Sequence, residues 1–256
     1  MRLLDFGLVA TACGSLVQAN PTGRHSKPPN LFLIGDSTVA VDGGWGNGLL
    51  SYLKDPPARG ENRGLSGATT VTWKLDGRWE KLIGDIHSIK ADYEPIVTVQ
   101  FGHNDQKVMS SEEFKSNMVN ITNDIRAAGG TPILITSLTR RNFGDDGKVK
   151  QDHTQWGNLA QYAAATIAAA EEAGVKFLDL NKASEAYVNA IGEENSVNYD
   201  WGPGDATHLN PAGEIVFGRM TLDLLLKARG DLRGYFTSNK ELSRKIAAGE
   251  FATGDE

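Results

Sequence analysis

Four short apolar runs, separated by segments with helical spacing, constrain the fold of this chain more than any other feature. The runs are residues 31–34, 96–101, 132–137 and 175–180. Apolar runs of this length, bounded by Gly, Pro and polar residues, are typical of buried strands. Strands that alternate with helices predict an α/β fold, with a mainly parallel sheet covered by helices on both faces.

The segments between these strands predict the helices and one further strand. We expect helices over residues 45–53, 72–89, 110–129, 154–173, 184–191, 210–228 and 239–248, and a short strand within residues 61–69. Ser110, Asn210 and Pro211 are typical of helix starts, and Gly129 and Gly174 are typical of helix ends. No repeat or internal linker interrupts the pattern. Residues 30–256 are therefore predicted to form a single domain, with a loose C-terminal tail after the last helix.

The first 29 residues differ in composition from the rest. Arg2, an apolar stretch over residues 7–17 and the small-residue pattern 17–19 predict a secretory signal over residues 1–19, followed by a connector over residues 20–29. An ordinary N-terminal helix is the alternative. Cys13, the one cysteine, lies inside this segment, so we expect a secreted protein whose mature form has no disulfide. The residues before Cys13 are a poor match to a bacterial lipidation site. Asn120 begins a glycosylation sequon.

Charge and hydropathy exclude two classes of partner. The 256 residues carry a formal net charge of −6, so no basic footprint points to nucleic acid. No apolar run is long enough to cross a bilayer, so we expect no membrane partner.

Polar residues follow the ends of three predicted strands. Ser37, Gly67 and Asn104 lie at these ends, and a fourth polar cluster occupies residues 205–208. The carboxyl ends of parallel strands share one edge of a sheet, where ligands bind in α/β folds. These residues are therefore expected to converge, although they are far apart in the sequence.

Their chemistry is complementary. Ser37 is a weak nucleophile until a base takes its proton, and histidine is the usual base near neutral pH. His208 is preferred over its nearest rival, His103, because Asp205 lies three residues before it and can hold the imidazole. The backbone amides of Ser37 and Gly67 and the side-chain amide of Asn104 are candidate donors to an oxyanion.

Each of these residues also has a purely structural interpretation. Ser37 and Asn104 are common helix caps, Asp205 is a common turn residue, and Gly67 allows a tight loop. Any one of these interpretations is reasonable alone. That all of them hold at once, at one sheet edge, is much less plausible than a shared site.

Four motifs carry these residues. They read Gly35-Asp36-Ser37-Thr38, Asn62-Arg63-Gly64-Leu65-Ser66-Gly67, Gly102-His103-Asn104-Asp105 and Asp205-Ala206-Thr207-His208. Together they resemble the four blocks of the GDSL/SGNH hydrolases, which contribute a serine, a glycine, an asparagine and a histidine. Thr38 stands where the family name has Leu. Over residues 30–228 the chain is similar to the branch that contains the rhamnogalacturonan acetylesterases.

The resemblance implies a fold and a function. The fold is a three-layer α/β/α sandwich of the SGNH/flavodoxin-like type, and neither cofactor nor metal is expected. The implied function is a secreted, monomeric carbohydrate acetylesterase that acts on acetylated pectin, with Ser37, Asp205, His208, Gly67 and Asn104 as its catalytic residues. Disulfides found in secreted relatives have no counterpart in this chain. The alternatives are an esterase acting on acetylated xylan or a lipid ester, and a carbohydrate-binding protein without catalysis.

Other residues are candidates for sugar recognition. Arg63, Arg140 and Arg141 lie in loops expected near the active edge, where they would attract the carboxylate of galacturonate. The aromatic side chains of Trp45, Tyr199 and Trp201 are candidates for stacking on sugar rings. Solvated charges and core aromatics are the alternative interpretation of these six residues.

Overall fold

The computed structural model describes residues 27–151, 157 and 159–256. The predicted signal over residues 1–19, most of the connector and the predicted start of the helix at residue 154 lie outside the described residues.

Within the described residues, five parallel strands form one sheet in the order β2-β1-β3-β4-β5. The strands are β1 (Pro29–Gly35), β2 (Arg59–Gly64), β3 (Glu94–Gln100), β4 (Thr131–Ile135) and β5 (Lys176–Leu178). From β1 the chain moves outward to β2 on one side, and the later strands follow on the other side. The edge between β1 and β3 is therefore the topological switch point, where doubly wound folds bind their ligands.

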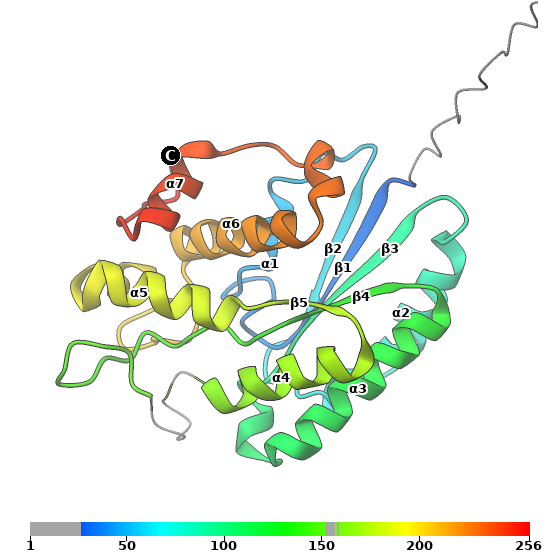
Figure 1. The fold of residues 1–256 in the computed structure, drawn as a ribbon, viewed down its shortest axis with the longest axis horizontal. Coiled ribbons are helices and arrows are strands. Elements are labelled where there is room, and N and C mark those ends of the chain that lie inside the picture. Colours follow the sequence, from blue (N-terminus) through cyan, green and yellow to red (C-terminus); the bar gives the residue numbers. More distant parts are fainter. Residues whose placement is uncertain (1–26, 152–156, 158) are drawn as a thin grey trace, which may run out of the picture.

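Helices cover both faces of this sheet (Figure 1). One layer contains α1 (Gly46–Leu50), α5 (Leu180–Ser196), α6 (Pro211–Ala228) and α7 (Lys240–Ala248). The other contains α2 (Arg78–Ile89), α3 (Ser111–Ala128) and α4 (Ala160–Ala173). Strand β1 contributes side chains to both hydrophobic cores, because Leu31 and Leu33 pack under the first layer and Phe32 and Ile34 pack under the second. The predicted three-layer α/β/α fold is confirmed.

The local signals at the helix ends act as expected. Ser110 Oγ accepts a hydrogen bond from the Glu113 N–H, and Asn210 Oδ1 accepts one from the Gly213 N–H. Gly129 ends α3 with a φ of 96°, a conformation that costs glycine little. Helices α3 and α6 thus begin and end close to their predicted positions.

Three predicted helices differ from the structure. Residues 72–89 form a 3₁₀ turn, η1 (Thr72–Lys74), and then α2, because Asp76 and Gly77 adopt positive φ and interrupt the helix. Leu75, which ends η1, is 55% exposed. The helix predicted over residues 45–53 is shorter in the structure and is limited to α1, Gly46–Leu50. The helix predicted over residues 184–191 is longer, because α5 begins directly after its cap Asp179 and ends at Ser196.

The C-terminal tail is packed, not loose. Ala252 is fully buried, and its carbonyl accepts a hydrogen bond of 2.6 Å from the Tyr199 hydroxyl. The Glu256 carboxylate accepts hydrogen bonds from Lys245 Nζ and from the Thr253 and Gly254 N–H groups. These contacts hold the tail against Tyr199 and α7, and burial with hydrogen bonding is the reason that it does not fray.

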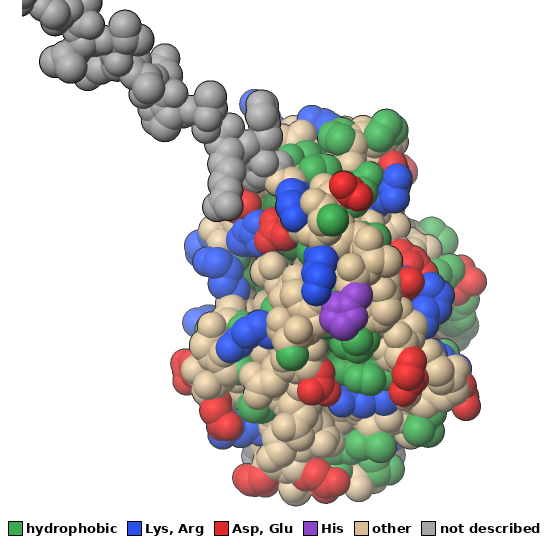
Figure 2. All heavy atoms as spheres, turned by 90° about the vertical axis from the view of Figure 1, so that its right-hand side faces the viewer, with side chains coloured by type: hydrophobic (Ala, Val, Ile, Leu, Met, Phe, Trp, Pro, Cys, Tyr) green, Lys and Arg blue, Asp and Glu red, His purple; other side chains and the backbone are tan. Residues whose placement is uncertain are grey.

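The surface on the right-hand side of Figure 1 mixes charges of both signs. There basic and acidic side chains alternate, and the hydrophobic ones lie in small groups (Figure 2). Among the described residues, no helix is long and apolar enough to cross a membrane.

Candidate active site

The turn after β1 presents Ser37 at the switch point. Asp36 is fully buried there, and its carboxylate accepts hydrogen bonds from the N–H and hydroxyl of Thr38 and from the His103 N–H. The Asp36 N–H donates to the Gln100 carbonyl of β3. Because Asp36 joins the ends of β1 and β3, the position of Ser37 is defined from both strands.

Ser37, His208 and Asp205 form one chain of hydrogen bonds. Ser37 Oγ lies 2.8 Å from His208 Nε2, and His208 Nδ1 lies 2.9 Å from Asp205 Oδ2. A carboxylate can only accept, so the network assigns the proton to Nδ1 and leaves Nε2 free to accept from the serine hydroxyl. This is the arrangement in which a histidine can take a proton from a serine.

Asp205 remains ionised in this setting. Burial raises its pKa, but hydrogen bonds from the N–H and ring of His208, with the N–H of Thr207, outweigh burial, so the pKa lies below its ordinary value. The same carboxylate therefore shapes the turn and orients the imidazole.

Three hydrogen-bond donors lie in one cleft: the backbone N–H groups of Ser37 and Gly67, and the side-chain amide of Asn104. The backbone N–H groups of Ser37 and Gly67 donate to no group of the described chain. Gly67 has a φ of 75°, which favours glycine at this position. Asn104 Nδ2 donates to the Ala68 carbonyl at 3.0 Å, which leaves its second N–H for a ligand. The five predicted site residues are thus brought together.

Asp105 links the loops that carry these donors, a role that the sequence analysis missed. Its buried carboxylate accepts hydrogen bonds from the N–H and hydroxyl of Thr70 at 2.8 and 2.7 Å, and from the Gly102 N–H at 3.1 Å. Burial raises the pKa of Asp105. The available signal was its place beside Asn104 in the third motif.

His103 has a different environment from His208. Its ring is buried, and Nε2 donates to the Leu138 carbonyl at 2.9 Å, not to Ser37. Burial and the charge of Arg140 hold the pKa of His103 well below 6.5. The structure therefore places His208, and not its rival, against the serine.

The three arginines have separate environments. The expectation for Arg63 is wrong, because its guanidinium pairs with Glu61 and Asp85 and does not line the cleft. Arg140 does line the cleft, although it is buried and donates to Thr207 Oγ1 at 3.2 Å.

Arg141 supports the site from behind. It is buried, pairs with Asp200 at 2.8 Å, and donates to the carbonyls of Asp205 at 3.3 Å and His208 at 2.6 Å. Arg141 thus holds the loop that carries the histidine and is not available to a sugar.

Two of the three candidate stacking residues belong to the core. Trp45 and Tyr199 are fully buried, so the expectation that they contact sugars is wrong. Trp45 Nε1 donates to Gln100 Oε1, and Tyr199 packs against Phe217. Trp201 is 48% exposed and lies in the same loop as His208, so its role in stacking stays a prediction.

Ser37, His208 and the amide donors lie in a cleft with a volume of about 500 Å³. Its lining comprises Ser37, Ser66, Gly67, His103, Asn104, Lys107, Arg140, Asn142, Pro203, Gly204, Asp205, Ala206, Thr207 and His208. Among the described residues, no group of three His, Cys, Asp or Glu side chains is placed to hold a metal ion. The cleft thus presents a serine, a base and amide donors.

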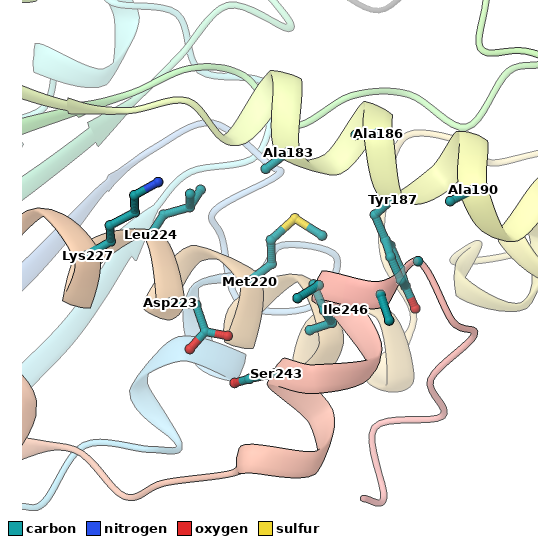
Figure 3. Close-up of a pocket in the computed structure, with 13 residues that line it drawn as sticks. Ala183, Ala186, Tyr187, Ala190, Met220, Asp223, Leu224, Lys227, Ser243 and Ile246 are labelled. Carbon is teal, nitrogen blue, oxygen red and sulfur yellow. The ribbon is translucent and has the colours of Figure 1, made fainter.

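A second cavity of similar size lies between α5, α6 and α7 (Figure 3). Alanines of α5 face Met220 and Leu224 of α6 and Ile246 of α7 across it. Its lining contains no residue of the four motifs, so it is separate from the cleft around Ser37.

Comparison with known sequences identifies relatives of this chain. Residues 33–214 match the GDSL-like Lipase/Acylhydrolase family. The rhamnogalacturonan acetylesterase RhgT of Bacillus subtilis (strain 168) is 29% identical over 219 residues, which cover 77% of this chain and 89% of that protein.

Comparison with solved structures gives the same fold. Protein YXIM of Bacillus subtilis superposes with a TM-score of 0.64 at 26% identity, over 80% of this chain; the chain spans 58% of that protein. The acetylxylan esterase Axe2 of Geobacillus stearothermophilus gives a TM-score of 0.58 at 17% identity, covering 84% of this chain and 99% of that one.

Proposed function

This chain belongs to the GDSL-like lipase/acylhydrolase family and is an ester hydrolase, and we propose that it removes acetyl groups from pectic rhamnogalacturonan. The observation that carries the catalytic part of the proposal is the chain of hydrogen bonds from Ser37 through His208 to Asp205. The substrate is proposed from the likeness to a rhamnogalacturonan acetylesterase.

The first half of the reaction acylates the serine. Ser37 Oγ forms a bond to the acetyl carbonyl carbon while its proton passes to His208 Nε2, and the carbonyl π electrons move onto oxygen. Collapse of this tetrahedral species breaks the bond between the acetyl carbon and the sugar oxygen. The sugar leaves with the proton from Nε2, and Asp205 stabilises the imidazolium in between.

The second half restores the enzyme. Water attacks the acetyl carbon and gives a proton to Nε2; the bond from that carbon to Ser37 Oγ then breaks, Oγ takes the proton back, and acetate leaves. Both tetrahedral species carry an oxyanion. The amides of Ser37, Gly67 and Asn104 are proposed to bind it, since they lie in the cleft with free N–H groups.

The location proposed for the protein follows from its substrate. A pectic polymer is too large to cross a membrane, so the enzyme would meet it outside the cell, in agreement with the signal pattern of residues 1–19. We propose that the enzyme acts there as a monomer. Trp201, exposed in the loop that carries His208, is a candidate platform for a sugar ring.

The test is acetate release from acetylated rhamnogalacturonan and acetylated xylan, measured side by side for the wild type and for Ser37→Ala. Release mainly from the pectic polymer, with none from the variant, is the expected result. Release mainly from xylan keeps the mechanism and overturns the substrate. Full activity in Ser37→Ala, with an unchanged fold by circular dichroism, contradicts the mechanism.

A further inference from the structure

Lys107 differs from the other charged groups of the cleft. It lies in the 3₁₀ turn η2 (Asp105–Lys107) and is exposed, and its Nζ donates to Asn104 Oδ1 at 3.0 Å. No carboxylate of the described chain lies within ion-pair distance of it. An ammonium group has three donors, so two remain for a ligand.

The charges of the cleft lining contrast with those of the whole chain. The chain has 32 acidic and 26 basic residues, whereas the cleft is lined by Lys107, Arg140 and one carboxylate, that of Asp205. Asp205 already faces the ring of His208. The cleft therefore carries more positive than negative charge inside an otherwise acidic protein, and clefts lined by one sign of charge attract ligands of the other.

Of the two cations, Lys107 is the one that a substrate can reach. Arg140 is buried, and its donors serve Thr207 Oγ1 and the Gly157 carbonyl. Lys107 Nζ lies one side-chain amide away from the Nδ2 group proposed to bind the oxyanion. Because Lys107 Nζ contacts the Asn104 amide, a carboxylate on the acetylated sugar or on its neighbour can lie beside Lys107.

We infer that Lys107 is a specificity-determining residue that binds a carboxylate of the substrate and so selects acetylated uronic acid polymers over neutral ones. The inference rests on the proposed function, which supplies the acetyl ester. It assigns to one lysine the preference for an acidic polysaccharide.

The test compares two forms of one substrate. Acetylated rhamnogalacturonan oligosaccharides are used with free carboxylates and with the carboxylates converted to methyl esters, and kcat/KM is measured as acetate release. The variants are Lys107→Gln and Lys107→Glu. Lys182→Gln is the matched control, because Lys182 is an exposed lysine on α5 that does not line the cleft.

The readout is the ratio of kcat/KM for the acidic substrate to that for its methyl ester. We expect Lys107→Gln to lower this ratio about 5- to 10-fold, Lys107→Glu to lower it further, and Lys182→Gln to leave it unchanged. The ratio for the wild type is expected to fall with added salt, because exposed charges are screened.

An equal loss on both substrates would assign Lys107 to holding Asn104 and overturn the inference. Activity equal to that of the wild type on both substrates would overturn it as well. Hydrolysis of 4-nitrophenyl acetate, with Ser37→Ala as its control, reports on the reaction separately. If no ester is cleaved in a Ser37-dependent manner, the proposed function itself fails. If 4-nitrophenyl acetate is cleaved but the ratio does not change when Lys107 is substituted, only the inference fails.

Discussion

At the scale of single residues, the amide of Asn104 is held at both ends. Lys107 Nζ donates to its oxygen and its nitrogen donates to the Ala68 carbonyl, so the remaining N–H has a defined direction. In the proposed mechanism this N–H binds charge that exists only after attack. We therefore predict that Asn104→Ala lowers kcat about 100- to 1,000-fold, with little change in KM.

Steady-state kinetics on an acetyl ester check this prediction. Asn120→Ala is the matched control, because Asn120 is an exposed asparagine on α3, away from the cleft. A loss expressed only in KM, or an equal loss in the control, would contradict the role proposed for Asn104.

The buried carboxyl group of Asp36 should make the stability of the protein depend on pH. Burial raises its pKa from 3.8 to about 6, although the N–H and hydroxyl of Thr38 lower it. The folded protein thus holds a proton that the unfolded chain releases near pH 4. The stabilisation is fully present below pH 4 and is lost as the pH rises through 6, which amounts to about 3 kcal/mol.

Urea unfolding of the wild type and of Asp36→Asn at pH 4 and pH 7 measures this effect. Between the two pH values, the free energy of unfolding of the wild type should fall by about 2 kcal/mol relative to the variant, because part of the full effect is already lost at pH 4. Other titrating groups, including Asp205, are common to both proteins and cancel in the difference. A difference between the proteins that stays constant with pH would refute the assignment.

At the scale of elements, glycines set the distance between α1 and α6. A Cβ atom on Gly48 would lie 1.8 Å from the Glu214 carbonyl oxygen, and one on Gly218 would lie 2.4 Å from the Gly48 carbonyl carbon. The backbones touch there, and α6 starts just after His208. We predict that Gly48→Ala lowers the free energy of unfolding by about 2 to 3 kcal/mol and also lowers activity.

Gly84→Ala is the matched control for this change. Gly84 lies in α2, and beyond its chain neighbours and the nearby backbone of that helix nothing lies within 4 Å of the position that its Cβ would occupy. Alanine there should raise stability by about 0.5 to 1 kcal/mol. Equal effects of the two substitutions in chemical denaturation would show that close helix contact is not the cause.

At the scale of the whole molecule, the C-terminal segment completes the layer of α5, α6 and α7. Tyr187 and Tyr199 are joined by their hydroxyls, and the Ala252 carbonyl accepts from Tyr199. Removal of residues 250–256 would take away the carbonyls of Glu250 and Ala252 that accept from these hydroxyls, and would leave the two buried groups with only each other. We predict a loss of about 2 to 4 kcal/mol in the free energy of unfolding, measured by urea denaturation. Asp255→Ala, an exposed change in the same tail, should have little effect.

Much of the fold was predictable because its signals are local. Apolar runs of four to six residues mark the strands, and Ser110 and Asn210 cap helices through side chains that reach only three residues along the chain. The helix predicted over residues 72–89 was wrong because hydrophobic spacing continues past Asp76 and Gly77, whose positive φ interrupts it. Backbone conformation at two residues outweighed the pattern there.

In the candidate site, too, some features were predictable from the sequence and others were not. The sequence by itself determined that Ser37, Gly67, Asn104 and His208 follow strands or precede a helix, and parallel strands must then bring them to one edge. Only the tertiary structure decided which neighbours face the cleft. Arg141 is buried against Asp200, 59 residues away, whereas Lys107 stays exposed beside Asn104. Side-chain orientation depends on contacts between distant segments, and no local pattern in the sequence encodes those contacts.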